Sequence, residues 1–228
     1  MSSRSYRRVL VKISGECFSQ PQLLASIIRQ LTSVQRRRVA VAVVVGGGNI
    51  VRGRDLRSGD SRVTLDRAGM LATVINGLEL TEKLGQKTPV QHLCAFPVAG
   101  LVEGFSLERA RHCLDNGNIL VLSGGTGHPF FSTDSAAALR AVELELEVIL
   151  KGTWVKGVYS ADPKKDPRAR FYRRLTFEQA LTERLAVMDL AAFALCQEHR
   201  IPVVVFDIRR PKAIIDIVSG KQIGSLVC

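Results

Sequence analysis

Lysine, serine and glycine residues stand directly after several short apolar runs of this 228-residue chain, at residues 12–15, 46–49, 123–127 and 151–153. Glycine lets the main chain come close to an oxyanion and point several N–H groups at it, and lysine adds a positive charge. One such loop is a weak signal, because glycines also make tight turns. Three glycine loops with two lysines indicate a site that holds several phosphate groups.

The elements that must position these residues are read from the hydrophobic pattern. Short apolar runs alternate with longer helical patterns, which is typical of a parallel sheet covered on both faces. We expect strands at residues 8–13, 39–45, 90–93, 119–122, 148–150 and 203–206, and helices at 23–34, 66–83, 106–116, 135–145 and 176–198. The predicted fold class is α/β, with a mainly parallel central sheet between helices. Ligands of such sheets bind at the carboxyl ends of the strands, where the glycine loops fall.

Composition excludes several classes of protein. With 46% hydrophobic residues, the chain can bury the core of one globular domain. Its longest strongly apolar run, residues 39–45, is far shorter than the roughly 20 residues of a membrane-spanning helix, so we expect no membrane segment. The five cysteines are odd in number and lack the spacing of metal ligands, which favours reduced thiols in a cytoplasmic protein and predicts no metal site.

The net charge of +11 indicates an anionic partner, such as a phosphorylated metabolite or a nucleic acid. The excess lies at the two ends of the chain: residues 1–70 carry +9, residues 71–163 carry −3 and residues 164–228 carry +5. We interpret Arg36, Arg37 and Arg38 as a solvated helix end that suits the helix dipole. Arg52 follows a glycine loop and is a better candidate for ligand contact. The P-loop and dinucleotide-binding motifs do not occur in the sequence.

The glycine loops and their neighbours resemble a known family. On its most specific motifs, at residues 12–15, 45–53, 69–76, 125–136, 161–163 and 187–193, the chain resembles the bacterial uridylate kinases of the amino acid kinase family. The resemblance extends from Val9 to near the C-terminus. It implies one amino acid kinase domain over residues 1–228, transfer of the ATP γ-phosphoryl group to UMP with Mg²⁺ bound to ATP, and a cytoplasmic homohexamer of pyrimidine biosynthesis.

The resemblance also implies which residues bind each nucleotide. ATP contacts fall on Lys12, Ile13, Ser14, Gly15, Gly48, Arg52, Thr153, Tyr159 and Asp162. UMP contacts fall on Gly47, Asp66, Thr126, Gly127, His128, Pro129, Phe130, Phe131, Ser132 and Thr133. We expect an acceptor-binding lobe at about residues 1–150 and an ATP-binding lobe at about residues 151–228.

The chemistry of phosphoryl transfer suggests catalytic roles. The acceptor phosphate has a second pKa of about 6, so it is largely dianionic at neutral pH and needs no general base. The obstacle is repulsion between anions, which positive charge and positioning overcome. We assign Lys12 to the transferring group, Lys151 to its support and Asp134 to the orientation of both lysines.

Several residues keep a second interpretation. Asp134 also suits the capping of the helix predicted at residues 135–145. Asp189 is either functional or a buried structural partner. We interpret Phe130 and Phe131 as a pocket wall, and Trp154 as a packing residue.

The chain departs from its relatives at three places. It has His128 where they usually have Asn, and Lys156 where they have Asp or Asn. Its segment 16–23 is shorter than the glycine-bearing segment associated with GTP activation in many relatives, so the resemblance does not carry GTP control over to this chain.

Two alternative functions stay open. One is a different amino acid kinase that phosphorylates a carboxylate or carbamate. It would keep the fold and the ATP loops, but Asp66 and residues 126–133 favour a nucleotide acceptor. The other is a basic nucleic-acid-binding protein, although the sequence has no helix-turn-helix, zinc-finger or RNA-recognition motif.

Overall fold

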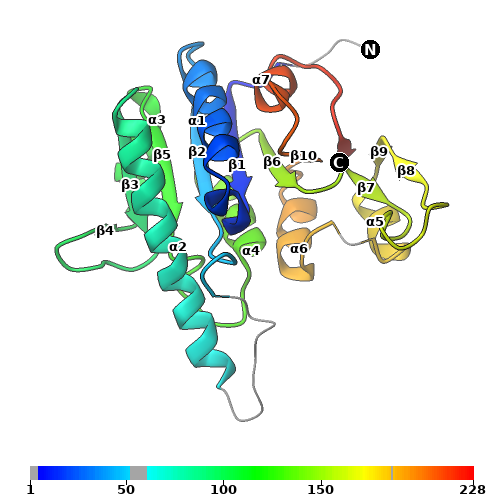
Figure 1. The fold of residues 1–228 in the computed structure, drawn as a ribbon, viewed down its shortest axis with the longest axis horizontal. Helices are drawn as coiled ribbons and strands as arrows, with labels where there is room; N and C mark the ends of the chain where they lie inside the picture. The colour runs from blue at the N-terminus through cyan, green and yellow to red at the C-terminus, as the bar shows by residue number, and fades with distance from the viewer. Residues whose placement is uncertain (1–4, 52–60, 186) are drawn as a thin grey trace.

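The computed structural model of the chain describes residues 5–51, 61–185 and 187–228. In these residues nine strands form one sheet, in the order β4-β3-β5-β2-β1-β6-β10-β11-β9 (Figure 1). The strands of this sheet are β1 (Arg8–Ile13), β2 (Ala40–Val45), β3 (Val90–Cys94), β4 (Glu103–Gly104), β5 (Ile119–Ser123), β6 (Val148–Thr153), β9 (Arg174–Leu175), β10 (Val203–Asp207) and β11 (Ser225–Val227). Neighbouring strands are parallel except for β10 and β11. A separate antiparallel pair consists of β7 (Val158–Tyr159) and β8 (Phe171–Tyr172).

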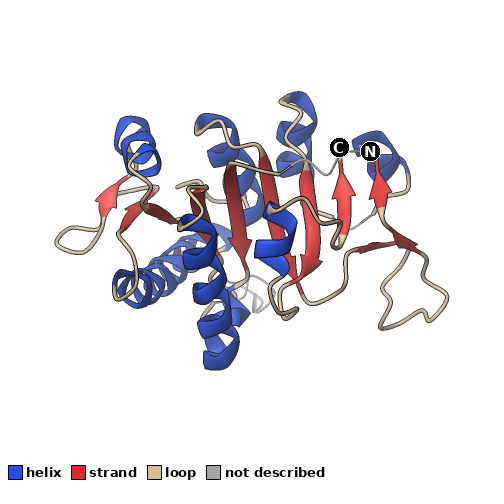
Figure 2. Ribbon diagram, turned by 90° about the horizontal axis from the view of Figure 1, so that it is seen from above, coloured by secondary structure: helices blue, strands red, loops and turns tan. Residues whose placement is uncertain are grey.

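Helices cover both faces of the sheet (Figure 2). One face carries α1 (Pro21–Gln35), α2 (Arg62–Gly85) and α7 (Ala213–Val218). The other carries α3 (Leu107–Asp115), α4 (Thr133–Glu143), α5 (Phe177–Thr182) and α6 (Leu190–Glu198). A short 3₁₀ helix, η1 (Gly15–Ser19), joins β1 to α1. This arrangement confirms the predicted α/β class.

The alternation of side chains along β1 separates the core from the chemistry. Val9, Val11 and Ile13 point into the hydrophobic cluster beneath α1 and α7, whereas Leu10 points into the cluster beneath α4. Because successive side chains of a strand point to opposite faces, Lys12 lies on the same face as Leu10. One face of β1 is therefore packed in the core beneath α1 and α7, and the other face places Lys12 on the side of α4.

The predicted helix over residues 176–198 is wrong in one respect, because the segment folds as two helices. The α5 helix begins at its cap Thr176, whose hydroxyl accepts from the Gln179 N–H, and ends at Thr182. After it, Arg184 adopts a left-handed conformation with φ of 50°. A new helix, α6, then begins at its cap Asp189. Each cap favours the start of a new helix at its own position, and this outweighs the continuous helical pattern of the sequence.

Other differences are smaller. The helix expected from residue 66 begins at Arg62, with Ser61 as its cap. The short elements η1, α7, β4, β7, β8, β9 and β11 were not predicted from the sequence. All five cysteines are free thiols. In the described part of the chain, no helix is both long and apolar enough to cross a membrane.

Candidate active site

Two lysines face each other across neighbouring strands at the carboxyl edge of the sheet. Lys12 of β1 is in register with Lys151 of β6. Like charges in this position repel, and Asp134, the second residue of α4, offsets one of the two charges. One carboxylate oxygen of Asp134 lies 2.9 Å from the Lys12 ammonium and the other lies 2.5 Å from that of Lys151. Three separate elements thus place one acidic and two basic side chains together.

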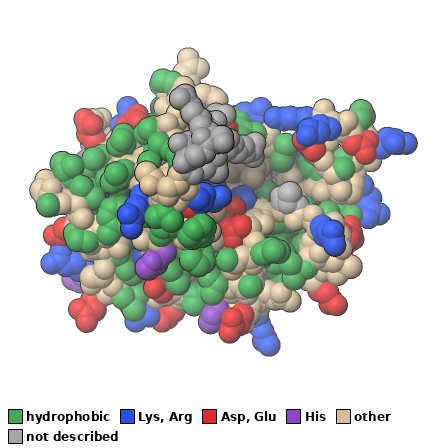
Figure 3. Space-filling model, turned by 90° about the horizontal axis from the view of Figure 1, so that it is seen from below, with side chains coloured by type: hydrophobic (Ala, Val, Ile, Leu, Met, Phe, Trp, Pro, Cys, Tyr) green, Lys and Arg blue, Asp and Glu red, His purple; other side chains and the backbone are tan. Residues whose placement is uncertain are grey.

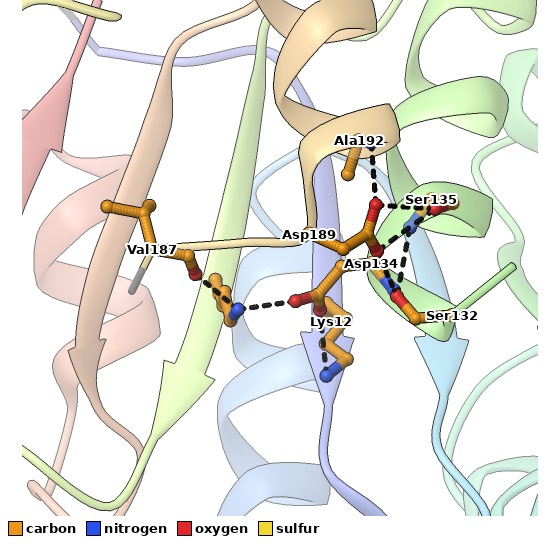
Figure 4. A network of polar contacts seen from close by, with 8 residues as sticks. Lys12, Ser132, Asp134, Ser135, Val187, Asp189 and Ala192 are labelled. Carbon is orange, nitrogen blue, oxygen red and sulfur yellow. Dashed lines mark hydrogen bonds and ion pairs between the residues drawn. The ribbon is translucent and has the colours of Figure 1, made fainter. Parts of the chain in front are cut away.

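A second aspartate holds this cluster in place (Figure 4). Asp189 caps α6 through the Ala192 N–H at 2.9 Å, and it accepts hydrogen bonds from Ser135 at 2.8 and 3.0 Å and from Ser132. Ser132 is itself the cap of α4, so Asp189 ties the beginnings of α4 and α6 together. In the same turn, the Val187 carbonyl accepts a hydrogen bond from Lys151. These contacts support the structural interpretation of Asp189, which is half-buried and holds the elements that carry the cluster.

The side chains of the cluster are mostly buried, and burial affects the pKa values of Asp134 and Lys151. The side chains of Lys12, Lys151 and Asp134 are only 14%, 14% and 13% exposed. Burial opposes ionisation of Asp134, but the adjacent Lys12 and Lys151 charges outweigh it and hold the pKa of this carboxyl below its usual value. Burial lowers the pKa of Lys151, and Lys12 adds to the lowering, while Asp134 opposes it. With both lysines protonated, the cluster carries a net positive charge.

The glycine loops after β1 and β2 are packed against each other. A Cβ on Gly15 would lie 2.6 Å from the Gly48 nitrogen, and one on Gly47 would lie 2.8 Å from the Gly69 carbonyl oxygen of α2. A Cβ on Gly48 would meet no atom of the described residues within 4 Å. Gly15 and Gly47 are thus required by close packing, whereas the described residues leave room for a side chain at Gly48.

Asn76 of α2, for which no role was predicted from the sequence, supports the loop after β2. Its side chain is 1% exposed and donates to the Gly46 carbonyl oxygen at 2.7 Å. It also exchanges hydrogen bonds with Asn49 at 2.8 and 3.2 Å. The only sequence signal for this role is its place inside the motif at residues 69–76.

The loop after β5 is bound to α2 at two points. The Gly124 N–H donates to the Thr73 hydroxyl at 2.7 Å, and the Phe130 N–H donates to the Asp66 carboxylate at 2.8 Å. Asp66 also accepts from Arg62 at 2.9 and 3.0 Å. The backbone is left-handed at Gly124, Gly125 and Gly127 and at Phe130, which has a φ of 70°. Asp66 is therefore brought to the loop that holds residues 126–133, which are the other predicted UMP contacts apart from Gly47.

The predicted UMP contacts of this loop are exposed or half-buried. The Thr126 hydroxyl accepts from the His128 N–H at 3.2 Å. Phe130 and Phe131 are 69% and 51% exposed, so neither is a core residue. Pro129 is half-buried, as are Gly127 and Thr133, whereas Ser132 is exposed. The cluster of Lys12, Asp134 and Lys151 lies where this loop enters α4.

The predicted ATP contacts come from two separate parts of the chain, residues 12–52 and residues 153–162. Ser14 is the cap of η1, and the Ile13 side chain is buried in the core, so only its main chain is available to a ligand. Thr153 donates towards the Val155 and Phe206 carbonyl oxygens at 2.9 and 3.1 Å. Tyr159 packs on Phe171 with ring centroids 5.3 Å apart, and Asp162 accepts from the Lys164 N–H. Arg52 lies outside the described residues.

A cavity of about 460 Å³ lies beside these ATP segments, and among the described residues its lining consists of their neighbours in the sequence and not of the predicted ATP contacts themselves. It is lined by Glu16, Ser19, Gln20, Asn49, Trp154, Lys164 and Arg209, which follow the strands β1, β2, β6, β7 and β10. Arg209 donates to the Trp154 carbonyl oxygen at 3.0 Å and is paired with Asp207 at 2.7 Å. The indole N–H of Trp154 is buried and has no hydrogen-bond partner among the described residues. Trp154 packs against the core as predicted, and it also lines this cavity.

The cavity and the lysine cluster belong to the same edge of the sheet. The parallel strands point to the lower side of Figure 1. Figure 3, seen from that side, shows basic and acidic side chains together near the middle of the face, with apolar side chains around them. The site therefore has a charged centre between the loops predicted for the two nucleotides.

The described residues do not hold a metal ion by themselves. No group of three or more His, Cys, Asp or Glu side chains is placed to do so in the described part of the chain. Asp134 is paired with two lysines, and Asp189 is used by hydroxyls and a helix cap. These carboxylates do not fit the role of a metal cage.

Comparison with known proteins identifies the class. Residues 7–207 match the model of the amino acid kinase family, so the chain belongs to that family. The uridylate kinase of Paramagnetospirillum magneticum is 46% identical, covering 99% of this chain and 98% of the relative. That of Coxiella burnetii is 41% identical, covering 97% and 95%. Within the amino acid kinases, the chain belongs to the uridylate kinases.

Solved structures agree with this placement. The crystal structure of UMP kinase from Bacillus anthracis has a TM-score of 0.94 and 34% sequence identity, covering 98% of this chain and 96% of that one. UMP kinase from Ureaplasma parvum has a TM-score of 0.90 and 36% identity, covering 98% and 99%. The whole described architecture is thus similar to that of UMP kinases.

Proposed function

We propose that this protein transfers the γ-phosphoryl group of ATP to UMP, giving UDP and ADP. The observation that carries the proposal is the buried cluster of Lys12, Asp134 and Lys151 between two sets of glycine loops. An acceptor phosphate oxygen attacks the γ-phosphorus, and the bond from that phosphorus to the bridging oxygen breaks to release ADP. The cluster supplies fixed positive charge where negative charges meet, which is the main requirement of this reaction.

Asp134 acts as a positioning residue in this proposal. It keeps two ammonium groups near each other, although their repulsion would otherwise separate them. Lys12 has an ion pair with Asp134, while the described residues complete no well-aligned hydrogen bond to that carboxylate oxygen. We assign the Lys12 ammonium to the transferring phosphoryl group, while Lys151 is held by its hydrogen bonds to Asp134 and to Val187.

On the donor side, we assign ATP phosphates to the main chain of residues 12–15, to Gly48 and to Arg52. The adenosine portion is assigned to Thr153, Tyr159 and Asp162. The adjacent 460 Å³ cavity supports this assignment, since it joins the glycine loops to the segment that follows β6. Mg²⁺ would enter bound to the ATP phosphates and lower their negative charge.

On the acceptor side, we assign UMP to Gly47, Asp66 and residues 126–133. Arg62 and the Phe130 N–H hold Asp66 at this loop, which supports its assignment to the ribose. The lobe assignments follow from these sites, with acceptor binding in residues 1–150 and adenosine binding in residues 151–228. Both parts share one continuous sheet through β1, β6 and β10.

A cytoplasmic homohexamer in pyrimidine biosynthesis completes the proposal. Leu71 and Ile75 are 51% and 55% exposed, and they lie four residues apart on one face of α2. Such an apolar strip favours contact with another subunit. The measurement is the mass of the assembly in solution.

The experiment that tests the function is an acceptor panel. ADP release from ATP is measured with UMP, CMP, acetylglutamate, glutamate, aspartate and carbamate, with and without GTP. We expect turnover with UMP. Activity confined to a carboxylate or to carbamate would replace the proposal by the other amino acid kinase chemistry, and salt-sensitive RNA binding without turnover would favour a nucleic-acid-binding protein.

The acceptor assignment is tested by Asp66→Ala. This change should chiefly raise the KM for UMP, because a binding contact is lost while the lysine cluster remains. Arg67→Ala, on the next residue of the same helix, is the matched control. An unchanged KM for UMP in a folded Asp66→Ala variant removes Asp66 from the acceptor site.

A further inference from the structure

A second cavity, of about 580 Å³, lies far from the lysine cluster and is not used by the proposed reaction. It is formed by the last turns of α1 and by the residues that follow α2, and it is lined by Arg29, Thr32, Ser33, Arg36, Arg37, Gln86 and Lys87. Both helices end at the top of Figure 1, whereas the strands carry the candidate active site at the lower side. The cavity thus occupies the opposite edge of the fold. We call it the basic pocket.

Four cationic side chains converge on the basic pocket: Arg29, Arg36, Arg37 and Lys87. All four are exposed, and none forms an ion pair with a carboxylate of the described residues. Other surface arginines do have acidic partners, such as Arg8 with Asp115 and Arg111 with Glu145. Unpaired like charges around one hollow create a positive potential that a bound anion would relieve.

The helix dipole explains only part of this cluster. Cations at a helix C-terminus are favoured, but the effect is confined to the last turn. It suits Arg36 and Arg37 behind α1 and Lys87 behind α2. Arg29 lies six residues before the end of α1, beyond the reach of that effect. Arg29 and Arg36 lie seven residues apart along the same face of α1, and the packing of α1 beside α2 brings Lys87 to them.

The polar groups of the basic pocket suit phosphate oxygens. A guanidinium offers parallel N–H donors that match two oxygens of one phosphate. Arg37 is oriented by a hydrogen bond from its Nη1 to the Ser219 hydroxyl at 3.0 Å. Ser33 lines the same surface, and its hydroxyl adds a hydrogen-bond donor there.

The shape of the basic pocket selects among anions. No aromatic side chain lines it, so it offers no platform on which a nucleobase could stack. Its cations gather on one hollow instead of following a strip, as an extended nucleic acid would require. The volume is within the range of about 300–1,000 Å³ that small-molecule sites occupy. These features favour a short phosphate chain over a nucleoside or an RNA.

We propose that the basic pocket binds a compact anion with several phosphate groups, such as an oligophosphate, at a site separate from the kinase site. The proposal goes beyond the proposed function and does not depend on it. It gives a role to Arg36 and Arg37, which the reaction does not use.

The probe is inorganic tripolyphosphate, titrated calorimetrically into the full chain at low ionic strength. A non-hydrolysable ATP analogue and UMP are present in excess to occupy the kinase site. We expect one tripolyphosphate per chain. The variant Arg29→Gln/Arg36→Gln/Arg37→Gln should bind it at least about tenfold more weakly for each charge-assisted hydrogen bond lost. Its circular dichroism and its turnover of ATP and UMP should match those of the unmodified chain.

A charge-matched control separates a site from general attraction. The variant Arg38→Gln/Arg173→Gln/Arg200→Gln removes three exposed arginines outside the basic pocket. It should keep the affinity of the unmodified chain. An equal loss in both variants, or no binding to the unmodified chain, overturns the proposal. Binding of a single-stranded RNA that the pocket variant alone loses, without tripolyphosphate binding, also overturns it and assigns the surface to nucleic acid.

Discussion

The two groups of cations at opposite edges of this fold differ in how their charge is balanced. Lys12 and Lys151 are nearly buried and share one carboxylate, Asp134. The arginines and lysine of the basic pocket are exposed, and they have no acidic partner in the described residues. Water solvates an exposed cation, but a buried one is costly unless it is paired. Burial therefore dictates the aspartate in one place, and exposure makes it unnecessary in the other.

The two sites also differ in construction. The lysine cluster requires β1, β6 and α4 in register, and the turn before α6 secures it through Asp189 and Val187. The basic pocket requires only that two helices end side by side. Substitutions should consequently have large and coupled effects in the first site and small, separate effects in the second.

The largest effect is expected from Lys12→Ala. Without its charge at the transferring group, kcat should fall by about 10³-fold or more, since electrostatic contacts of this kind contribute that much to phosphoryl transfer. Steady-state ADP release measures it, with circular dichroism to show that the variant is folded. The control is Lys83→Ala, which removes an exposed lysine paired with Glu79. Turnover close to normal in a folded Lys12→Ala variant would refute the catalytic role.

Asp134→Asn removes the negative charge that pairs with Lys12 and Lys151 in the buried cluster. Two nearly buried ammonium groups would lose their counter-charge, so the free energy of unfolding should fall by about 3 kcal/mol, and activity should fall with it. Urea unfolding measures the change. Asp115→Asn is the control, because that aspartate is 64% exposed in its pair with Arg8 and should change stability by less than about 1 kcal/mol. Equal effects of the two substitutions would show that burial is not the cause.

His92 tests the same rule for a buried group without a charged partner. Burial lowers the pKa of His92 from 6.5 to about 4; its ring Nε2 bonds to the Ser123 hydroxyl at 2.8 Å, and its Nδ1 has no partner among the described residues. Because the unfolded chain takes up this proton more readily, stability should be complete above about pH 6.5 and fall by up to about 3 kcal/mol towards pH 4. Urea unfolding across this pH range measures the loss.

The control for that measurement is a comparison of two histidine substitutions. His92→Gln should flatten the pH dependence of stability between pH 6.5 and about 4, the interval between the ordinary and the lowered pKa. His112→Gln, at the exposed end of α3, should leave it unchanged. If His92→Gln keeps the full dependence, another group causes it.

The smallest effect is expected from Arg36→Gln in the basic pocket. An exposed arginine without an ion pair should change the free energy of unfolding by no more than about 0.5 kcal/mol. Thermal and urea unfolding at low ionic strength measure it, with Arg38→Gln as the control. A loss of more than about 1 kcal/mol would mean that Arg36 supports the fold, which would remove the contrast between the two sites.

The sequence was informative wherever a local pattern has one structural solution. Continuous apolar runs such as residues 39–45 predicted buried parallel strands, and the glycine loops predicted the edge of the sheet that binds ligands. Residues 176–198 were misassigned because their helical pattern is continuous, while the caps Thr176 and Asp189 divide it in the folded chain. Asn76 could not be assigned at all, since its partners Gly46 and Asn49 are distant in the sequence.

By itself, the sequence determined the class of the fold, the lysines at the strand ends and the glycines that border them, because strand periodicity and loop composition are local properties. Only the tertiary structure decided which charges meet. It paired Asp134 with both lysines across 122 and 17 residues of chain and brought Arg29 to Lys87, because such contacts depend on strand register and helix packing. The arginine run that looks like a plain helix end thereby becomes one wall of a pocket.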